Sequence, residues 1–578
     1  MLEITDQTQT DRLLANGYIE ATFWKDLKVK LNMGIDKNQG RRSTYLPKST
    51  LYVKQEGGKA NINENRTVDL LFELTANYTK QLFKERDRLE VLLGYSYQQE
   101  NWDGLGAGSS QFFTDLFLWN KLEAGNVARP PVSSSKGKNE LGSYFGRINY
   151  SLLDKYLFTF SLRYDGSSKF GKNNKWGLFP SGAFAWKMQN ENFLKDVDWL
   201  SELKLRVSFG QTGNSNIGGN AYEYYEAGNQ YVFGDAVQTG SIKSQLENPD
   251  LKWETTTELN VGLDFGFLNN RITGSFEYFH KVVSDLLAFR KLNSLMEVST
   301  IADNIGATQS TGYEFSLNTV NLTGPFKWNT TLNISSYNDR WKERNPDVVL
   351  APYEKEDAPI RAIYGCVSDG ILQIGETPPA SMPDLLPGQM KVKDLNGFDP
   401  NDGSKLLGHP DGKIDAADRI YLGSTDPKVI IGFGNMFEYK NFDLNIFFYG
   451  MFGQYVANSN RAKYGPSGCE YILERQNYSK EVLERWTTNK FPSGFYSAYY
   501  GGDDWLLEKV SFVRCKNITL GYSFPHKWIH KVFSQARIYV DVENPFIITN
   551  YQGLDPEMDS KGGYPSQRTY SIGIDITF

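Results

Sequence analysis

The chain has 578 residues, of which 14% are aromatic and 22% are charged, and its formal net charge at pH 7 is -6. Acidic and basic residues are interspersed, so the basic stripe that binds nucleic acid is missing and no DNA or RNA partner is expected. No run of about 18 apolar residues occurs, which excludes a membrane-spanning helix.

The cysteines and the amino terminus give little information about function. Cys366, Cys469 and Cys515 lack the CxxC spacing of a zinc site, and whether two of them pair is left open. The first segment, MLEITDQTQT, lacks the charged start and the apolar core of a secretory signal. If the protein is exported, we expect its signal to lie outside this chain.

Alternation of apolar and polar residues dominates the chain, in segments of about nine to eleven residues, the length that a tilted strand needs to cross a bilayer. Residues 258–265 and 536–543 are clear examples, because every second side chain is apolar. Such strands have one lipid-like face and one wet face. A soluble β-sandwich would show the same alternation, so the connections between the strands must decide.

Short and long connections alternate along the chain. The brief polar turns are at 24–26, 84–87, 152–155, 267–270, 321–325 and 439–441. The long segments are about 37–66, 101–138, 213–253, 283–310, 339–427 and 454–505. Because outer-membrane barrels have short periplasmic turns and long extracellular loops, this order predicts an all-β, transmembrane antiparallel β-barrel with the long segments as extracellular loops.

The predicted strands number about 17, which is odd. They are expected near 14–24, 26–36, 67–79, 88–100, 140–151, 156–165, 176–188, 203–212, 254–265, 271–282, 311–321, 326–338, 428–440, 442–453, 510–523, 536–545 and 567–578. Single-chain bacterial barrels have even counts, because an open edge in lipid leaves backbone groups without partners. Either the count is in error or strands are missing.

Several motifs resemble those of one family. They are LKLRVSFGQTGN (203–214), NPDLKWE (248–254), PGQMKVKDLNG (387–397), FVRCKNITLGYSFP (512–525), ARIYVDVENPFIITNYQGLDPE (536–557) and YPSQRTYSIGIDITF (564–578). The last is an alternating strand that ends on Phe578 and is similar to the aromatic assembly signal of outer-membrane barrels. Together the motifs resemble SusC/RagA-like TonB-dependent transporters.

The resemblance implies a 22-stranded barrel filled by an N-terminal plug, in the cell outer membrane. It also implies a SusD-like surface lipoprotein as partner, energy from TonB-ExbB-ExbD through the plug, and oligosaccharides or peptides as substrates. This chain departs from that pattern, since the plug and about five strands are absent. Residues 1–578 are therefore expected to be the C-terminal part of such a barrel, and not to be competent for import alone.

The segment 339–427 contains acidic residues around glycines. The candidate metal ligands are Asp394, Asn396, Asp399, Asp411, Asp415 and Asp418. Calcium takes six to eight oxygen ligands, which alternating Asp and Asn can supply. An insertion breaks the standard spacing, and acidic turn residues often only cap hairpins. A structural calcium ion is one expectation and a capping role is the other, while no cofactor is expected to be required.

Aromatic residues in three predicted loops are candidates for substrate binding. They are Trp102, Trp119, Tyr222, Tyr224, Tyr225, Tyr496, Tyr499 and Trp505. Aromatic rings flanked by Asp and Asn can hold sugar rings. The alternative is that they form interfacial girdles or contact the lipoprotein.

No recognisable motif places a nucleophile beside a base, so no enzymatic activity is expected. His526 and His530 lie four residues apart near a predicted periplasmic turn, a spacing that means little without a helix. Two hypotheses remain for the function. The first is outer-membrane import of oligosaccharides or peptides, and the second is a β protein that binds surface glycans without moving them.

Overall fold

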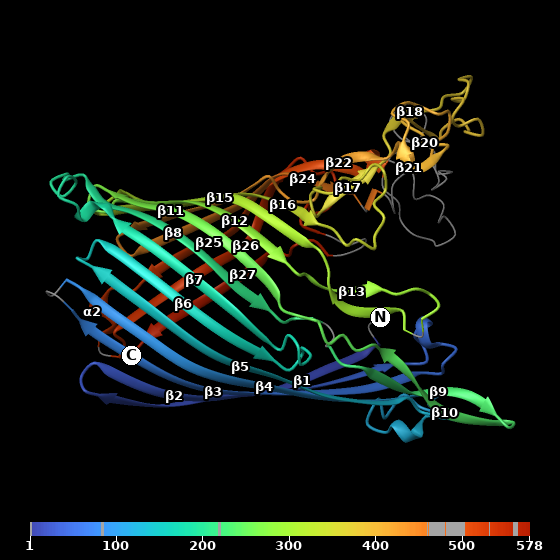
Figure 1. The fold of residues 1–578 in the computed structure, drawn as a ribbon, viewed down its shortest axis with the longest axis horizontal. Helices are drawn as coiled ribbons and strands as arrows, with labels where there is room; N and C mark the ends of the chain where they lie inside the picture. The colour runs from blue at the N-terminus through green and yellow to red at the C-terminus, as the bar shows by residue number, and fades with distance from the viewer. Residues whose placement is uncertain are drawn as a thin grey trace. The chain divides into compact units, whose positions relative to one another are not determined.

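A computed structural model describes residues 3–82, 86–217, 221–296, 298–458, 460–461, 480, 503–530, 532–558 and 564–578. Within these residues, 17 strands form one antiparallel sheet (Figure 1). They are β1 (Thr5–Phe23), β2 (Leu27–Leu46), β3 (Lys59–Gln81), β4 (Arg88–Ser110), β5 (Val132–Leu152), β6 (Tyr156–Ser167), β7 (Trp176–Lys187), β8 (Leu200–Asn214), β11 (Glu254–Phe267), β12 (Ile272–Ser284), β15 (Ala307–Leu322), β16 (Phe326–Glu343), β23 (Val429–Tyr439), β24 (Phe442–Ala457), β25 (Leu507–Ser523), β26 (Gln535–Thr549) and β27 (Thr569–Thr577). The expected strand count is confirmed.

Five two-stranded sheets lie outside the large sheet in the described part of the chain. They pair β9 (Tyr224–Phe233) with β10 (Ala236–Gln245), β13 (Leu287–Lys291) with β14 (Thr300–Asn304), β17 (Ala362–Gly365) with β22 (Ile420–Ser424), β18 (Ser368–Ile371) with β19 (Met390–Val392), and β20 (Phe398–Asp399) with β21 (Asp402–Leu406). The helical turns are η1 (Leu51–Val53), η2 (Leu122–Ala124), η3 (Met188–Asn190), η4 (Ala416–Asp418), η8 (Asp503–Leu506) and α2 (His526–Ile529). Among the residues described, no helix is long and apolar enough to cross a membrane.

The chain forms two compact units. Unit 1 comprises residues 1–185, 208–257 and 285–305, and unit 2 comprises residues 186–207, 258–284 and 306–578. In unit 1, β1 to β6 pair with their neighbours in sequence order. In unit 2, β12, β15, β16 and β23 to β27 do the same. Each unit therefore contains a meander of antiparallel strands.

Residues with positive φ close two short turns of unit 1. The angle φ is positive at Trp24 and Lys25 between β1 and β2, and at Leu153 and Asp154 between β5 and β6. Two successive residues with positive φ are typical of the type I′ turn, whose twist matches that of the flanking strands. These turns lie together at one end of the strands of unit 1 (Figure 1).

The strands of unit 1 extend beyond the ends predicted from alternation. β3 and β4 pair without a register shift from Lys59 opposite Ser110 to Gln81 opposite Arg88. They therefore continue into the segments 37–66 and 101–138, which the sequence assigned to loops. These strand ends carry mostly polar or small residues on both faces, so backbone hydrogen bonds continue where the apolar alternation has stopped. The predicted loops 213–253, 283–310 and 339–427 likewise contain the small sheets.

Candidate functional site

The strands of unit 1 present one apolar face. The strand register places Leu31 and Met33 of β2 opposite Leu74 and Phe72 of β3, which in turn lie opposite Tyr95 and Tyr97 of β4. Although they have strand neighbours on both sides, Met33 is 52% exposed and Leu74 is 42% exposed. A contiguous apolar surface of this kind indicates contact with another protein or with a membrane.

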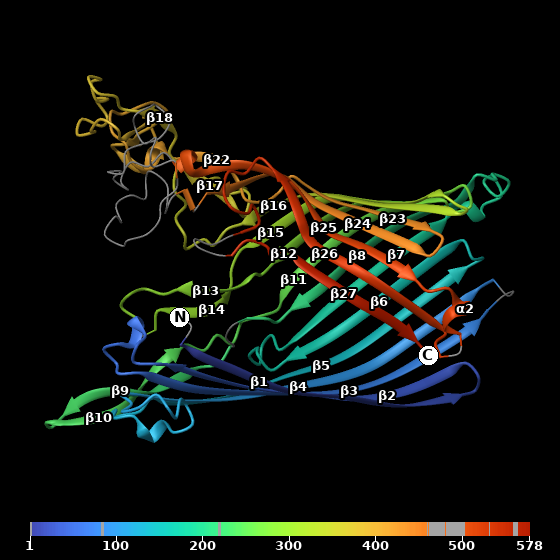
Figure 2. The same ribbon diagram turned by 180° about the vertical axis from the view of Figure 1, so that it is seen from behind.

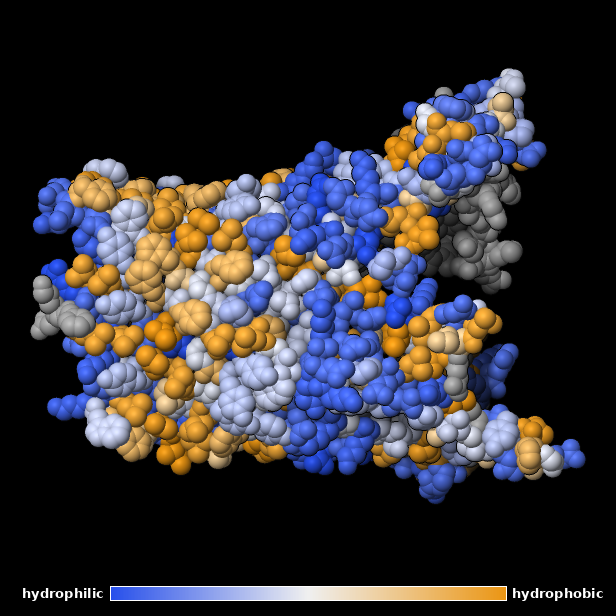
Figure 3. Space-filling model, viewed as in Figure 1, coloured by the Kyte–Doolittle hydropathy of each residue, from blue (hydrophilic) through white to orange (hydrophobic). Residues whose placement is uncertain are grey.

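The height of this face matches a lipid bilayer. From Val68 to Tyr78, β3 makes ten residue steps, which at ~3.3 Å per step span about 33 Å along the strand. A tilt of ~40° reduces this length to about 25 Å, the height of the apolar band of an outer-membrane barrel. Hydrophobic residues gather over the short-turn ends of β4 to β6, and hydrophilic residues lie toward the opposite ends, on the side seen in Figure 3.

Aromatic rings cluster on the same face of unit 1. The Tyr164 and Trp176 rings stack with centres 4.9 Å apart, and Tyr144 lies 6.1 Å from Trp176. The indole covers Gly166, where an added Cβ would lie 2.7 Å from its ring atoms, so glycine is needed for this packing. Aromatic girdles of this kind mark the membrane interfaces of barrels.

The opposite face of unit 1 is polar. The guanidinium group of Arg12 on β1 donates two hydrogen bonds, of 2.9 and 2.6 Å, to the carboxylate of Asp36 on β2. On β4 and β5, the amide of Asn139 donates to Glu100 at 2.9 Å. These pairs alternate along the strands with the apolar residues, so each strand separates a wet side from an apolar side.

Unit 2 carries a denser charged network on β8, β11 and β12. Arg206 donates to both carboxylate oxygens of Asp264, at 2.8 and 2.7 Å, and to Glu277 at 2.8 Å. Lys204 lies 3.3 Å from Asp264, and the amide of Asn260 donates to Glu277 at 3.3 Å. Two carboxylates therefore balance two cations, in a geometry that fixes the Arg206 fork.

The last strands of unit 2 repeat the two-faced design. Arg537 of β26 donates to Asp443 of β24 at 3.0 and 2.6 Å and to Asp575 of β27 at 3.2 Å. Ile538 and Val540, which alternate with the polar residues of β26, lie opposite Ile574 and Ile572 of β27. The alternation predicted for residues 536–543 therefore separates a charged face from an aliphatic one.

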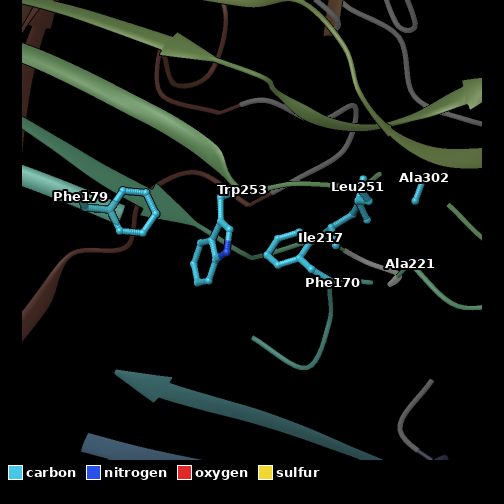
Figure 4. Packing of buried hydrophobic residues seen from close by; sticks show 7 residues of the cluster. All are labelled: Phe170, Phe179, Ile217, Ala221, Leu251, Trp253 and Ala302. Atoms are coloured by element: carbon cyan, nitrogen blue, oxygen red, sulfur yellow. The ribbon is translucent and has the colours of Figure 1, made fainter. Parts of the chain in front are cut away.

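A buried cluster, here called the loop core, holds three connections of unit 1 together (Figure 4). Its members are Phe170, Phe179, Ile217, Ala221, Leu251, Trp253 and Ala302. The centre of the Trp253 ring lies 5.1 Å from the centre of the Phe170 ring and 5.5 Å from that of Phe179. Burying each large side chain contributes roughly 1.5–3 kcal/mol, so the cluster can fix segments that have few backbone partners.

Polar contacts of the segment NPDLKWE reinforce the loop core. The side chain of Asn248 donates to the carbonyl of Ala302 at 2.8 Å, and the indole NH of Trp253 donates to the carbonyl of Lys175 at 3.2 Å. The Asn304 amide accepts from the backbone of Lys252 at 2.8 Å and donates back to its carbonyl at 2.8 Å. We call Asn248, Trp253 and Asn304 the loop clasp, because the hydrogen bonds of each side chain join two different connections between strands.

In unit 2, an ion-pair network holds a connection between strands against the sheet. Arg514 is buried on β25 and donates to Asp555 at 2.6 Å and to Glu557 at 2.5 Å in the connection between β26 and β27. Burial raises the pKa of Asp555, but hydrogen bonds from the backbone of Glu557 and from Ser566, with the Arg514 charge, bring this pKa below its usual value. The motifs FVRCKNITLGYSFP and YQGLDPE are therefore joined by two ion pairs, both made by Arg514.

Two of the predicted substrate residues have different surroundings. Trp102 is 40% exposed on β4 and lies across from Gly137 on the face that carries Glu100. Trp119 is buried with Tyr45 and Phe112. The Tyr45 hydroxyl donates to Asp115 at 2.7 Å, and burial together with this carboxylate raises the pKa of Tyr45. Trp119 thus belongs to a packed cluster, whereas Trp102 presents an accessible ring.

The other predicted aromatic residues do not form one cluster in the described residues. Tyr222 donates to the carbonyl of Phe170 beside the loop core at 3.3 Å, whereas Tyr224 and Tyr225 lie exposed at the start of β9. In unit 2, the guanidinium group of Arg461 lies over the Trp505 ring, 5.6 Å from its centre. Tyr496 and Tyr499 lie outside the described residues. Substrate binding by this set stays a prediction.

The acidic segment folds around its own backbone. All six candidate ligands accept hydrogen bonds from amides: Asp394 from Gly412, Asn396 from Gly408, Asp399 from Asn401, Asp411 from Lys413, Asp415 from Ala417, and Asp418 from Leu395. The hairpin β20–β21 forms the insertion that interrupts the pattern. No three acidic, histidine or cysteine side chains converge as a metal site in the part of the chain described. A capping role is present, and the calcium ion stays a prediction.

The comparisons with known proteins agree with this geometry. Residues 4–379 match the family described as TonB dependent receptor-like, beta-barrel. The TonB-dependent receptor P3 of Formosa agariphila is 32% identical over 100% of this chain and 59% of its own length. The TonB-dependent receptor SusC of Bacteroides thetaiotaomicron is 32% identical over 96% of this chain and 54% of its own length.

Solved structures show the same fold. The structure of the RagAB peptide transporter matches with a TM-score of 0.84 and 24% identity, over 100% of this chain and 63% of that chain. The chain thus spans between 54 and 63% of the length of these relatives. The resemblance inferred from the motifs is confirmed, and the chain belongs to the TonB-dependent receptor-like β-barrels of the outer membrane, in their SusC/RagA-like form.

Proposed function

We propose that this chain forms most of the wall of an outer-membrane importer for oligosaccharides or peptides. The two-faced strands carry this proposal, because an apolar face about 25 Å high suits lipid while the opposite polar face suits an aqueous passage. Arg12 with Asp36 in unit 1 would face water, and so would Arg206 with Asp264 and Glu277 on the polar face of unit 2. A peptide substrate has support from the RagAB peptide transporter, whose fold the chain shares.

Import by the whole protein would need further parts. We propose that these further parts are a plug and about five strands, and we expect the plug to receive energy from TonB-ExbB-ExbD. β1 and β27 are exposed along nearly their whole lengths, as strands with an unpaired edge are, and such edges accept further strands. We also expect a SusD-like lipoprotein to cover the long loops.

Uptake by intact cells that carry the whole protein tests the proposal. Fluorescent oligosaccharides and peptides are supplied, and label inside the cells is separated from surface label with a membrane-impermeant quencher. We expect unaltered substrate inside, and loss of that fraction when a protonophore collapses the energy supply. Label that stays fully quenchable, with or without the protonophore, would instead support a surface glycan-binding protein that moves nothing.

A further inference from the structure

The connection between β25 and β26 carries two histidines on one helical turn. The amide of His530 donates to the carbonyl of His526 at 2.9 Å, which closes the turn of α2. Positions four apart lie on the same side of a helix. Their ring centres are 6.0 Å apart, and the ring planes are inclined by 29°. Both side chains are exposed, and α2 lies beside the carboxy-terminus in unit 2 (Figure 2).

The ring of His530 has a defined orientation. Its Nδ1 lies 3.1 Å from the carbonyl oxygen of Lys527. Because a carbonyl can only accept, Nδ1 is the nitrogen that carries the proton in the neutral ring, which leaves the lone pair on Nε2. Metal-binding histidines are oriented in this way, through a hydrogen bond from the ring nitrogen that does not bind the metal.

The turn is fastened to the end of the chain. Ser534 donates to the carbonyl of Thr577 through its amide at 2.8 Å and through its hydroxyl at 3.0 Å. The rings of Phe533 and Phe578 meet edge to face, with centres 5.4 Å apart. A turn that is already ordered pays less entropy when it binds a ligand.

We propose that His526 and His530 bind a divalent transition-metal cation of the Zn²⁺, Ni²⁺ or Cu²⁺ class. Imidazoles that share a tetrahedral ion with bonds of ~2.0–2.1 Å have ring centres roughly 5 Å apart. A change in χ1 has to bring the ring centres from 6.0 Å to that separation, because rotation about χ2 turns each ring about an axis that passes close to its centre. Water completes the coordination, because no cluster of three metal-binding side chains includes the pair among the residues described. Imidazole favours these ions over Ca²⁺ and Mg²⁺.

Titration of the full refolded chain with Cu²⁺ tests the site, with calorimetry for affinity and electron paramagnetic resonance to count the bound nitrogens. We expect two imidazole nitrogens on the tightest-bound ion, and an affinity lower by about tenfold or more in His526→Asn and in His530→Asn. His409→Asn is the matched control and keeps full affinity. Its exposed ring also faces a carbonyl, that of Pro410 at 3.0 Å, but has no second histidine in its turn.

Unchanged affinity in both single variants would overturn the proposal. A measurement on the unmodified chain avoids any dependence on the folding of variants. Bound Cu²⁺ should protect His526 and His530, but not His409, from acylation by diethyl pyrocarbonate, as measured by mass spectrometry of the peptides. Equal protection of all three histidines, or protection of none, would also overturn the site.

Discussion

Two aromatic parts of one connection in unit 1 have opposite surroundings. Leu251 and Trp253 are buried in the loop core, at 0% and 7% exposure, whereas Tyr231 and Phe233 on β9 are 54% and 75% exposed. Amino-acid composition alone does not show which of the two parts is buried and which is exposed. The segment with Trp253 meets Phe170 and Ala302 from other connections, whereas β9 pairs with β10 in a two-stranded sheet. A lone hairpin cannot bury its faces, so its aromatic rings stay available to a ligand or a partner.

Replacing the central ring of the loop core should give the largest effect. We expect Trp253→Ala to cost about 3–5 kcal/mol of local stability, because it leaves a cavity beside Phe170 and Phe179. Hydrogen exchange of residues 215–254 measures this loss as faster exchange of the protected amides. Strand β3 serves as the internal control. Unchanged exchange around Asn248 would show that the cluster does not hold the connection.

Removing the buried cation of unit 2 tests whether an ion pair can fasten a connection as firmly as an apolar core. Arg514→Met should cost about 3–5 kcal/mol, because Asp555 and Glu557 are left without their cation. Limited proteolysis between residues 550 and 568 measures the release of this connection. The double variant Arg514→Met/Asp555→Asn should recover part of the protection, and a double variant as sensitive as the single one would contradict this reason.

A polar member of the loop clasp should matter less than the indole ring. Asn304→Ala removes the two hydrogen bonds with Lys252, and we expect a cost of about 1–3 kcal/mol. The same exchange experiment should show faster exchange at residues 251–253, with residues 168–171 less affected. Asn304→Asp keeps the oxygen that accepts from Lys252 but loses both donated bonds, to the carbonyls of Lys252 and Asp285, and sets a carboxylate against those two oxygens, so it should be no better protected than the Ala variant. Unchanged exchange at residues 251–253 in the Ala variant would argue against this assignment.

The exposed hairpin should give the smallest effect on stability. Phe233→Ser changes a side chain that lies mostly in solvent, so we expect a change within about 0.5 kcal/mol. Exchange at Leu251 and Trp253 should equal that of the unmodified chain. A loss of protection there as large as in Trp253→Ala would remove the distinction between the two parts of the connection.

The sequence predicts the strands well because their signal is local. Alternating residues such as Leu263 and Asp264 mark two faces within a few positions, and turns such as Trp24–Lys25 add their own pattern. The loop clasp could not be found in this way, since Asn248 and Asn304 bond to residues that are distant in the chain, Ala302 and Lys252, and these contacts depend on packing. Trp119 shows the same difficulty, because an aromatic residue in a loop can be either accessible or buried. The helical turn at His526 is too short to give a periodic signal.

The strands should separate lipid from an aqueous passage. Single cysteines placed along β3 in a cysteine-free variant, with the protein in outer membranes, test this separation. Cysteines at positions 70, 72 and 74 should react with a lipid-soluble maleimide and those at 69, 71 and 73 with a water-soluble one, in strict alternation. Equal reaction with the water-soluble reagent at all six positions would contradict the account.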